Sequence, residues 1–333
     1  MATVDLFAIG NALIDQEFKV SDAFLVEQNL QKGTMQLSDG ATQASLYSNL
    51  QASQTYKGQA SGGSAANTTV AFAAFGGSAF YACRVGNDDL GKIYLDGLTE
   101  AGIQTTVKSV SEGVTGTCMV LVSPDSERTM HTYLGITAEL SAAQIDFSAL
   151  ETAKWLYIEG YLSTSDTARL AVKQARAIAK ANGVKIALTL SDPAMVQYAR
   201  QGLDELLDDG VDLLFCNEQE ALMYTHTETV DAALAVLRQK SQQVVITLSE
   251  KGALIATQDS QFNVAGRKVT AVDANGAGDA FAGAFLYAVN ADLGLQTAAE
   301  LAILVSSQVV SQFGPRLALA DYAELLHRLK DPA

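Results

Sequence analysis

The sequence predicts an α/β domain built on a mostly parallel sheet with helices on both faces. Short apolar runs alternate with helical patterns along the 333 residues, and continuously apolar strands are typical of parallel sheets that are buried on both faces. The chain has 4 prolines and no repeat, low-complexity tract or proline-rich linker. Because nothing marks a boundary between two domains, we expect residues 1–333 to form a single domain.

Six apolar runs rich in β-branched and aromatic residues are interpreted as buried strands. They cover residues 6–9, 79–82, 155–158, 186–189, 213–216 and 244–247. The stretches between and after them carry apolar residues at helical spacing. These predicted helices cover residues 64–75, 91–101, 166–182, 230–240, 279–289, 296–312 and 320–329.

Two stretches do not fit this alternation. Residues 14–60 are polar with scattered apolar positions, and residues 114–134 alternate as a β-hairpin would. We expect them to form a small antiparallel sheet that stands off the main one as a lid. A closing lid excludes water from the site beneath it, which is a common need in phosphoryl transfer.

Composition narrows the class of partner. Lys+Arg 22 against Asp+Glu 37 gives a net charge of −15 without a basic run, which argues against a nucleic-acid partner. The N-terminus lacks the basic start and apolar run of a signal peptide, and no apolar stretch is long enough to span a bilayer. Cys83, Cys118 and Cys216 lie far apart and fit neither a disulfide framework nor a zinc site, so we expect buried thiols in a reducing cytoplasm.

The most informative stretch covers residues 273–279, Asp-Ala-Asn-Gly-Ala-Gly-Asp, which leads into an apolar helix. Gly276, Ala277 and Gly278 leave backbone N–H groups uncovered where the helix dipole is positive, which makes a seat for phosphate. The carboxylate of Asp279 beside this seat makes sense if it takes a proton from a nucleophile while the N–H groups stabilise a transferring phosphoryl group. The alternative is an acidic N-cap after a glycine-rich turn.

Two other polar segments are candidate ligand sites. In residues 61–67, glycines that include Gly63 allow close approach to the backbone, and Asn67 offers both a donor and an acceptor to hydroxyl groups. The alternative is a tight turn with Asn67 facing solvent. Asn11 and Asp15 follow the first strand, at the edge where open α/β sheets bind ligands. Asp15 can accept hydrogen bonds from two vicinal hydroxyls, as on a sugar, or else stabilise a turn.

These elements, in this order, resemble the PfkB family of carbohydrate and nucleoside kinases over essentially the whole chain. Residues 62–67 and 273–279 look like the two family signatures, residues 84–91 are similar to its Val-Gly-x-Asp-x-x-Gly segment, and residues 217–220 to its Asn-x-x-Glu motif. Residues 10–15, 127–135 and 158–162 look most like the adenosine-kinase branch. The resemblance implies a ribokinase-like fold with a central, mostly parallel sheet, flanking helices and a small β lid.

The resemblance also implies roles for particular residues. Asp279 would be the general base, and Gly276, Ala277 and Gly278 would form the anion hole. The acceptor hydroxyls would be held by Asn11, Asp15, Gly63 and Asn67. Tyr161 would stack on a nucleobase, although it could equally pack under the lid. Asn217 and Glu220 would position Mg²⁺ and the nucleotide phosphates, Glu220 through water, although the pair could be a helix N-cap box. Thr247, Ser249 and Gly252 would belong to the loop that receives ATP, although this loop could be a plain turn.

Two departures from the family pattern affect these assignments. Ala274 occupies a position usually held by Thr, so a hydroxyl contact is lost there. Ser249 stands where Gly is common, which could change how closely the nucleotide approaches. The resemblance also allows a monovalent cation such as K⁺ near Asp273, held by backbone carbonyls that side-chain identity cannot test.

The sequence therefore predicts ATP-dependent phosphoryl transfer to a primary hydroxyl of a sugar or ribonucleoside, with adenosine as the leading candidate. We expect ATP and Mg²⁺ as cofactors, a small-molecule acceptor, and a monomer or homodimer. The first alternative is a sugar kinase of the ribose, fructose or ketodeoxygluconate type, and the second is a non-catalytic ligand-binding protein of the same fold. An NAD-dependent dehydrogenase is disfavoured because the third glycine of the dinucleotide pattern is missing, and no P-loop is present.

Overall fold

The computed structural model describes residues 4–106, 113–125 and 127–330. Within them, eight strands form the main sheet in the order β13-β12-β11-β10-β9-β8-β1-β5. Their bounds are β1 (Leu6–Ile9), β5 (Ala79–Ala82), β8 (Trp155–Glu159), β9 (Lys185–Thr189), β10 (Val211–Asn217), β11 (Ser241–Thr247), β12 (Gly252–Ala256) and β13 (Gln261–Ala265). The six predicted strands are confirmed, and they pair in parallel. Strands β12 and β13 add an antiparallel edge that the sequence did not predict.

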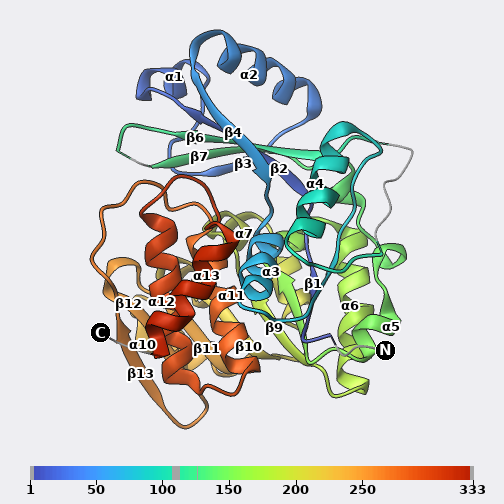
Figure 1. Ribbon diagram of the computed structural model, residues 1–333, viewed down its shortest axis with the longest axis vertical. Coiled ribbons are helices and arrows are strands. Elements are labelled where there is room, and N and C mark those ends of the chain that lie inside the picture. The colour runs from blue at the N-terminus through green and yellow to red at the C-terminus, as the bar shows by residue number, and fades with distance from the viewer. Residues whose placement is uncertain (1–3, 107–112, 126, 331–333) are drawn as a thin grey trace.

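Helices cover both faces of this sheet (Figure 1). One face packs against α3 (Ser64–Ala74), α4 (Asp89–Glu100), α11 (Ala277–Asn290), α12 (Leu295–Val310) and α13 (Leu319–Lys330). The other packs against α5 (Phe147–Glu151), α6 (Asp166–Ala181), α7 (Pro193–Tyr198), α8 (Arg200–Leu206), α9 (Glu218–Thr225) and α10 (Val230–Leu237). The seven predicted helices are confirmed as α3, α4, α6, α10, α11, α12 and α13.

Burial of both faces explains why the strands are continuously apolar. In β1, Leu6 and Ala8 enter the core beneath α3 and α11, whereas Phe7 and Ile9 enter the core beneath α6. Short 3₁₀ helices complete the connections: η1 (Gly135–Glu139), η2 (Ala142–Gln144), η3 (Gly160–Thr164) and η4 (Ser249–Lys251). We call the eight-stranded sheet with its helices the main body.

The described chain also contains a second sheet of five strands, in the order β3-β7-β6-β2-β4. Its strands are β2 (Leu13–Lys19), β3 (Met35–Leu37), β4 (Thr55–Ser61), β6 (Gly116–Val122) and β7 (Arg128–Tyr133), and α1 (Asp22–Glu27) and α2 (Gly40–Ser53) lie on it, at the top of Figure 1. The hairpin expected within residues 114–134 is confirmed as antiparallel β6 and β7; Ser126, in its turn, lies outside the described residues.

The expectation of a wholly antiparallel second sheet was wrong. Strands β2 and β6 pair in parallel, as do β3 and β7. The reason is that β2 and β6 both leave the main body in the same direction, with their first residues, Leu13 and Gly116, side by side. The helices α1 and α2 were also missed, because the polar pattern of residues 14–60 shows no clear helical period.

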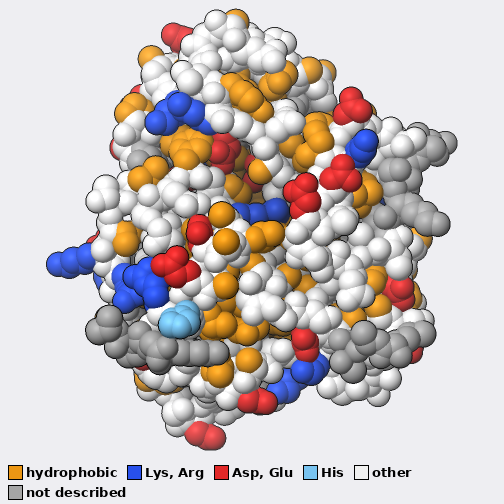
Figure 2. All heavy atoms as spheres, viewed as in Figure 1, with side chains coloured by type: hydrophobic (Ala, Val, Ile, Leu, Met, Phe, Trp, Pro, Cys, Tyr) orange, Lys and Arg blue, Asp and Glu red, His pale blue; other side chains and the backbone are white. Residues whose placement is uncertain are grey.

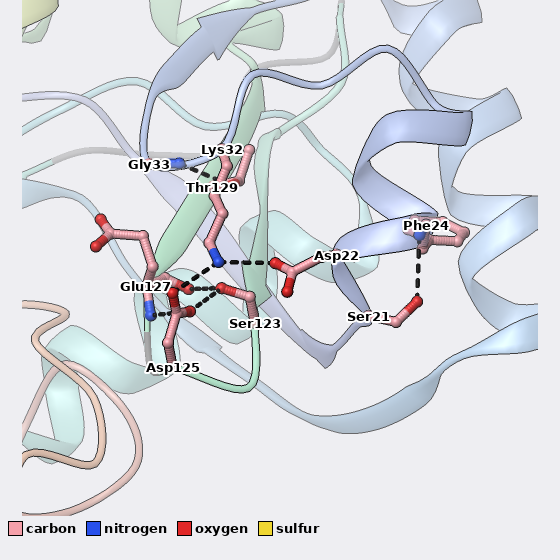
Figure 3. Close-up of polar contacts among 9 residues, drawn as sticks. All are labelled: Ser21, Asp22, Phe24, Lys32, Gly33, Ser123, Asp125, Glu127 and Thr129. Atoms are coloured by element: carbon pink, nitrogen blue, oxygen red, sulfur yellow. Dashed lines mark hydrogen bonds and ion pairs between the residues drawn. The ribbon is translucent and has the colours of Figure 1, made fainter.

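A cluster of ion pairs joins α1 to the β6–β7 turn at the outer edge of the second sheet (Figure 3). Lys32 Nζ lies 2.7 Å from Asp22 in the first turn of α1 and 2.7 Å from Asp125 in the β6–β7 turn. Ser123 donates to Asp125, which fixes the acceptor side of the cluster. These groups are partly or largely exposed, and surface pairs of this kind contribute little to stability. The cluster therefore orients α1 against the hairpin more than it stabilises the fold.

The expected buried thiols are confirmed, since Cys83, Cys118 and Cys216 are buried and form no disulfide. None of the helices in the described ranges combines the length and apolar character that crossing a membrane requires.

Candidate active site

A cavity of about 1040 Å³ lies between the second sheet and the carboxyl ends of the parallel strands. Figure 2 shows the surface hollowed between these two parts of the molecule. Ligand pockets commonly measure roughly 300–1,000 Å³, so this one has room for two small molecules. Every site residue proposed from the sequence lines it: Asn11, Asp15, Gly63, Asn67, Tyr161, Asn217, Glu220, Thr247, Ser249, Gly252, Gly276, Ala277, Gly278 and Asp279.

Asp279 stands in the first turn of α11, at the centre of a hydrogen-bond network. Ser64 Oγ donates to its Oδ1 at 2.6 Å, and Asn67 Nδ2 donates to its Oδ2 at 2.9 Å. Burial raises the pKa of Asp279, while the hydrogen bonds from Ser64 and Asn67 and the charges of Arg316 and Arg128 oppose that rise. Each carboxylate oxygen still has a lone pair free for one more donor. The group can therefore accept a proton from a bound hydroxyl.

The two glycines before Asp279 differ in what they do. Gly276 has a φ of +71°, in the left-handed region, and a Cβ there would collide with the Pro315 carbonyl oxygen. At Gly278 no described heavy atom lies within 4 Å of an added Cβ. Gly276 is thus needed for the turn itself, whereas Gly278 keeps open the space in front of the helix N-terminus. That space is where the first, unpaired N–H groups of a helix can bind an anion.

The Asn11 side chain is used mainly within the protein. Its backbone N–H and its Nδ2 both donate to Glu159 Oε1, at 2.7 and 2.8 Å. Glu159 Oε2 accepts the Ala65 N–H at 2.8 Å. Burial raises the pKa of Glu159 to about 7, against the effect of these N–H donors. Glu159, which had no assigned role, therefore joins the end of β1 to the start of α3 and fixes Asn11 in place.

Asp15 and Glu17 of β2 both place a carboxyl group near Asn275, in the loop before α11. Burial raises the pKa of Asp15 to about 7, with Arg316 opposing and Asp279 reinforcing the shift. Burial also raises the pKa of Glu17 to about 7, and the charges of Asp273 and Asp15 add to the effect. Asp15, which lines the cavity, and Glu17 are therefore two neighbouring carboxyl groups that are costly to ionise.

Arg128 and Arg316 balance these carboxylates, and sequence reasoning missed both. Arg128 of β7 lies 2.7 Å from Asp273 Oδ1 through its Nε, and its Nη1 donates to Asn275 Oδ1 at 3.0 Å. Arg316, after α12, donates from Nε to Asn67 Oδ1 at 2.7 Å. Arg128 lies in the segment that looks like the adenosine-kinase branch, which could have singled it out. Arg316 lies in no motif, and no sequence signal marked it.

Asn217 and Glu220 form a capping box at the start of α9. Asn217 Oδ1 accepts the Glu220 N–H at 2.8 Å, and Glu220 Oε2 accepts the Asn217 N–H at 3.0 Å. Burial raises the pKa of Glu220 to about 8, and the charges of Asp192 and Asp279 add to it. The helix N-cap box that was the alternative for this pair is thus confirmed. Asn217 and Glu220 also line the cavity.

The loop after β11 contains Ser249, at a position where the family pattern commonly has glycine. Thr247 ends β11 beside Asn217, and Ser249 follows with a φ of +53°. This left-handed conformation costs a non-glycine residue roughly 1–2 kcal/mol. Glycine is therefore favoured at this position for backbone reasons. Gly252 has a φ of +104° and packs against the backbone of β13, so no side chain fits there.

Apolar side chains cover much of the remaining wall. The second sheet contributes Leu13, Met35, Leu37 and Met130, and Leu134 follows directly after β7. Tyr161 faces them from η3, and burial raises the pKa of its hydroxyl well above the usual value, with the Asp192 charge adding to the effect.

The donor set for a metal ion is sparse. Among the residues that the structure describes, no three His, Cys, Asp or Glu side chains are grouped as metal ligands. Glu220 and Asp192 nevertheless share the cavity. Mg²⁺ keeps several waters and is often held by one or two carboxylates together with substrate phosphates. The residues therefore fit a Mg²⁺ ion that is bound mainly through water and phosphate.

Comparisons with known proteins agree with this architecture. The family described as "pfkB family carbohydrate kinase" matches residues 35–321. The ribokinase of Haemophilus influenzae is 32% identical over 68% of this chain and 74% of its own length. The adenosine kinase of Sinorhizobium meliloti superposes with a TM-score of 0.92 at 34% identity, covering 98% of this chain and 100% of that one. A probable sugar kinase of Rhizobium etli superposes with a TM-score of 0.92 at 32% identity, covering 98% and 99%.

Proposed function

This chain belongs to the pfkB family of carbohydrate kinases, and from that premise we propose that it phosphorylates the primary hydroxyl of a ribonucleoside, with adenosine as the leading candidate. Kinases of this family are phosphotransferases that use ATP and Mg²⁺. The observation that carries the proposal is the Asp279 carboxylate, held by Ser64 and Asn67 beside the open N-terminus of α11.

Asp279 acts as the general base. It accepts the proton of the acceptor hydroxyl while the hydroxyl oxygen bonds to the γ-phosphorus and ADP leaves. The N–H groups at Gly276, Ala277 and Gly278 stabilise the charge that develops on the transferring group. Mg²⁺ would neutralise phosphate charge, and Glu220 and Asn217 would hold it through water. Thr247, Ser249 and Gly252 line the end of the cavity that receives the nucleotide.

Asp15, Gly63 and Asn67 hold the acceptor sugar. Two oxygens on Asp15 suit a pair of vicinal ribose hydroxyls, and Gly63, with a φ of +91°, gives the ligand access to the backbone. Asn11 contributes mainly by position, since its backbone N–H and one N–H of its side chain donate to Glu159. The apolar wall and Tyr161 favour a nucleoside over a simple sugar, because a nucleobase brings apolar surface that a free hexose or pentose lacks.

A sugar kinase is the second candidate. The vicinal-hydroxyl arrangement at Asp15 suits a free pentose or hexose equally well, and the similarity to a ribokinase and to a probable sugar kinase supports that possibility. The lid motion is part of either proposal: the second sheet closes on the acceptor and excludes water.

The proposal is tested by ATP turnover with a panel of nucleosides and sugars, followed by identification of the phosphorylated product. We expect adenosine to give the highest kcat/KM and a 5′-phosphate. In parallel, Asp279→Asn should lower kcat by at least about two orders of magnitude, because loss of a general base typically costs roughly 10²–10⁴-fold. ATP affinity should be unchanged or higher, since a negative charge near the phosphate seat is removed. Turnover within a few-fold of wild type would remove Asp279 from the mechanism.

A further inference from the structure

The Asn67 side chain is fixed between a positive and a negative group. Arg316 Nε donates to Asn67 Oδ1 at 2.7 Å, and Asn67 Nδ2 donates to Asp279 Oδ2 at 2.9 Å. The opposite orientation of the amide would set its NH₂ group against the Arg316 N–H and its oxygen against a carboxylate. Arg316 therefore selects the amide orientation that presents a donor to Asp279.

The position of Arg316 is tied to the phosphate seat. It follows Gly314 and Pro315, and the Gly314 N–H donates to Asp273 Oδ2 at 3.0 Å. The Pro315 carbonyl packs against Gly276, at the point where a Cβ would collide. The turn that carries Arg316 thus contacts both Asp273 and Gly276. These two contacts hold the guanidinium in one place relative to Asp279.

Arg316 also differs from an arginine that only completes a structural network. Its Nη2 is buried and meets no acceptor among the residues described, although buried polar groups are nearly always satisfied. Its charge lowers the pKa of Asp279 and of Asp15, in both cases against the effect of burial. Its charge therefore acts on two carboxyl groups that line the cavity, Asp279 and Asp15.

We propose that Arg316 is a positioning residue for the base: through the Asn67 amide it fixes the Asp279 carboxylate, and by its charge it keeps that carboxylate ready to accept a proton. The inference rests on the proposed role of Asp279. Several other titratable groups interact electrostatically with Asp279 and are kept when Arg316 is replaced, although the pKa of Asp15 also rises without the Arg316 charge. They are Arg128 of β7, Asp15 of β2, Tyr157 and Glu159 of β8, Tyr161 of η3 and Glu220 of α9.

The test compares Arg316→Gln and Arg316→Lys with wild type in kcat, KM and the pH profile of kcat. Removing a positive charge raises the pKa of a nearby carboxyl group, and the base must be deprotonated to act. Arg316→Gln should therefore lower kcat at least about tenfold, which is part of the roughly 10²–10⁴-fold that general-base catalysis supplies, and shift the acidic limb of the profile to higher pH. In Arg316→Lys the acidic limb of the pH profile should lie where it does in wild type, because the positive charge is kept. Its kcat should recover only in part, because the hydrogen bond that orients Asn67 is lost.

A matched control is Arg238→Gln, since Arg238 bonds to the carbonyls of Thr257 and Ser260 outside the cavity. It should leave kcat and the pH profile unchanged. In the Asp279→Asn background, Arg316→Gln should cause little further loss, because residues that act as a unit are not additive. A full additional loss, or a rate loss with an unshifted acidic limb, would overturn the positioning role.

A readout that does not depend on turnover separates this inference from the proposed function. Carbon-13 spectra of aspartate-labelled protein, with Asp279 assigned by its loss in Asp279→Asn, should show Asp279 titrating at higher pH in Arg316→Gln than in wild type. An unchanged titration refutes the inference even when Asp279 is the base. A shifted titration in a protein that phosphorylates no acceptor refutes the proposed function and leaves the Arg316–Asn67–Asp279 arrangement standing.

Discussion

Arg128 Nε lies 2.7 Å from Asp273 Oδ1, and this ion pair joins β7 of the second sheet to the loop that begins the phosphate seat. The Arg128 side chain is 14% exposed and that of Asp273 is fully buried. Asp273 also accepts the N–H groups of Asn275 and Gly314. The position of the second sheet and the shape of the seat are therefore linked through one buried carboxylate.

Replacing Arg128 should loosen this link. In Arg128→Ala the Asp273 carboxylate keeps its N–H donors but loses its cation, and breaking a buried pair from one side typically costs about 3–5 kcal/mol. We expect a lower Tm and faster hydrogen exchange in β2 and β6. Lys32→Met is the control, because it removes ion pairs of the exposed outer edge, which contribute little to stability. Equal Tm losses in the two variants would contradict the link.

Closure of the second sheet on the acceptor should be visible by hydrogen exchange. Addition of the acceptor should increase protection mainly in residues 14–60 and 114–134, where the second sheet supplies Met35, Leu37 and Met130 to the cavity wall. Protection spread evenly over the main body, or none in these segments, would count against a lid. Comparison with the ATP-bound protein separates closure caused by the acceptor from closure caused by the nucleotide.

Asp15 should make acceptor binding depend on pH. Its pKa is raised to about 7, so its protonated form prevails below that pH and its charged form, the better hydrogen-bond acceptor, above it. The KM of the acceptor should therefore fall as pH rises through about 7. Asp15→Asn should abolish this dependence, and Asp15→Ala should raise KM sharply, since hydrogen bonds to a charged group contribute roughly 1.5–3 kcal/mol each.

The same shift has a consequence for stability. A carboxyl group whose pKa is higher in the folded than in the unfolded state stabilises the folded state most when it is protonated. The contribution of Asp15 to the free energy of unfolding is therefore lost as pH rises from about 4 to about 7. The Tm of Asp15→Asn should consequently vary less with pH over that interval than the Tm of wild type. A parallel pH dependence in both proteins would show that Asp15 is not the titrating group.

Gly278 offers a test of the phosphate seat that leaves the fold intact. An added Cβ meets no described atom within 4 Å, and alanine stabilises a helix relative to glycine by about 1 kcal/mol. Gly278→Ala should thus keep or raise the Tm while weakening phosphate binding and lowering kcat/KM for ATP. Gly58→Ala, at another glycine with open space around it, controls for the effect of a methyl group on Tm. Full activity in Gly278→Ala would place the transferring group elsewhere.

The sequence by itself determined the parallel strands, the main helices that cover them and many, though not all, of the residues that line the cavity. These features depend on residues close together in the chain: apolar runs define strands, and the stretch from Gly276 to Asp279 defines a turn and a helix start whatever surrounds it. Because the carboxyl ends of parallel strands meet at one edge, residues that follow different strands gather at one site.

The tertiary structure decided how those residues are paired. Asn67 was assigned to the acceptor, yet its amide lies between Asp279 and Arg316, and Arg316 stands 249 positions away in the chain. Arg128 reaches Asn275 across 147 positions, and Glu159 accepts a hydrogen bond from the Asn11 side chain across 148. No local periodicity encodes such contacts, because they arise only when the packed sheets and helices bring distant segments together. The charges that act on Asp279 are therefore a property of the fold and not of any one motif.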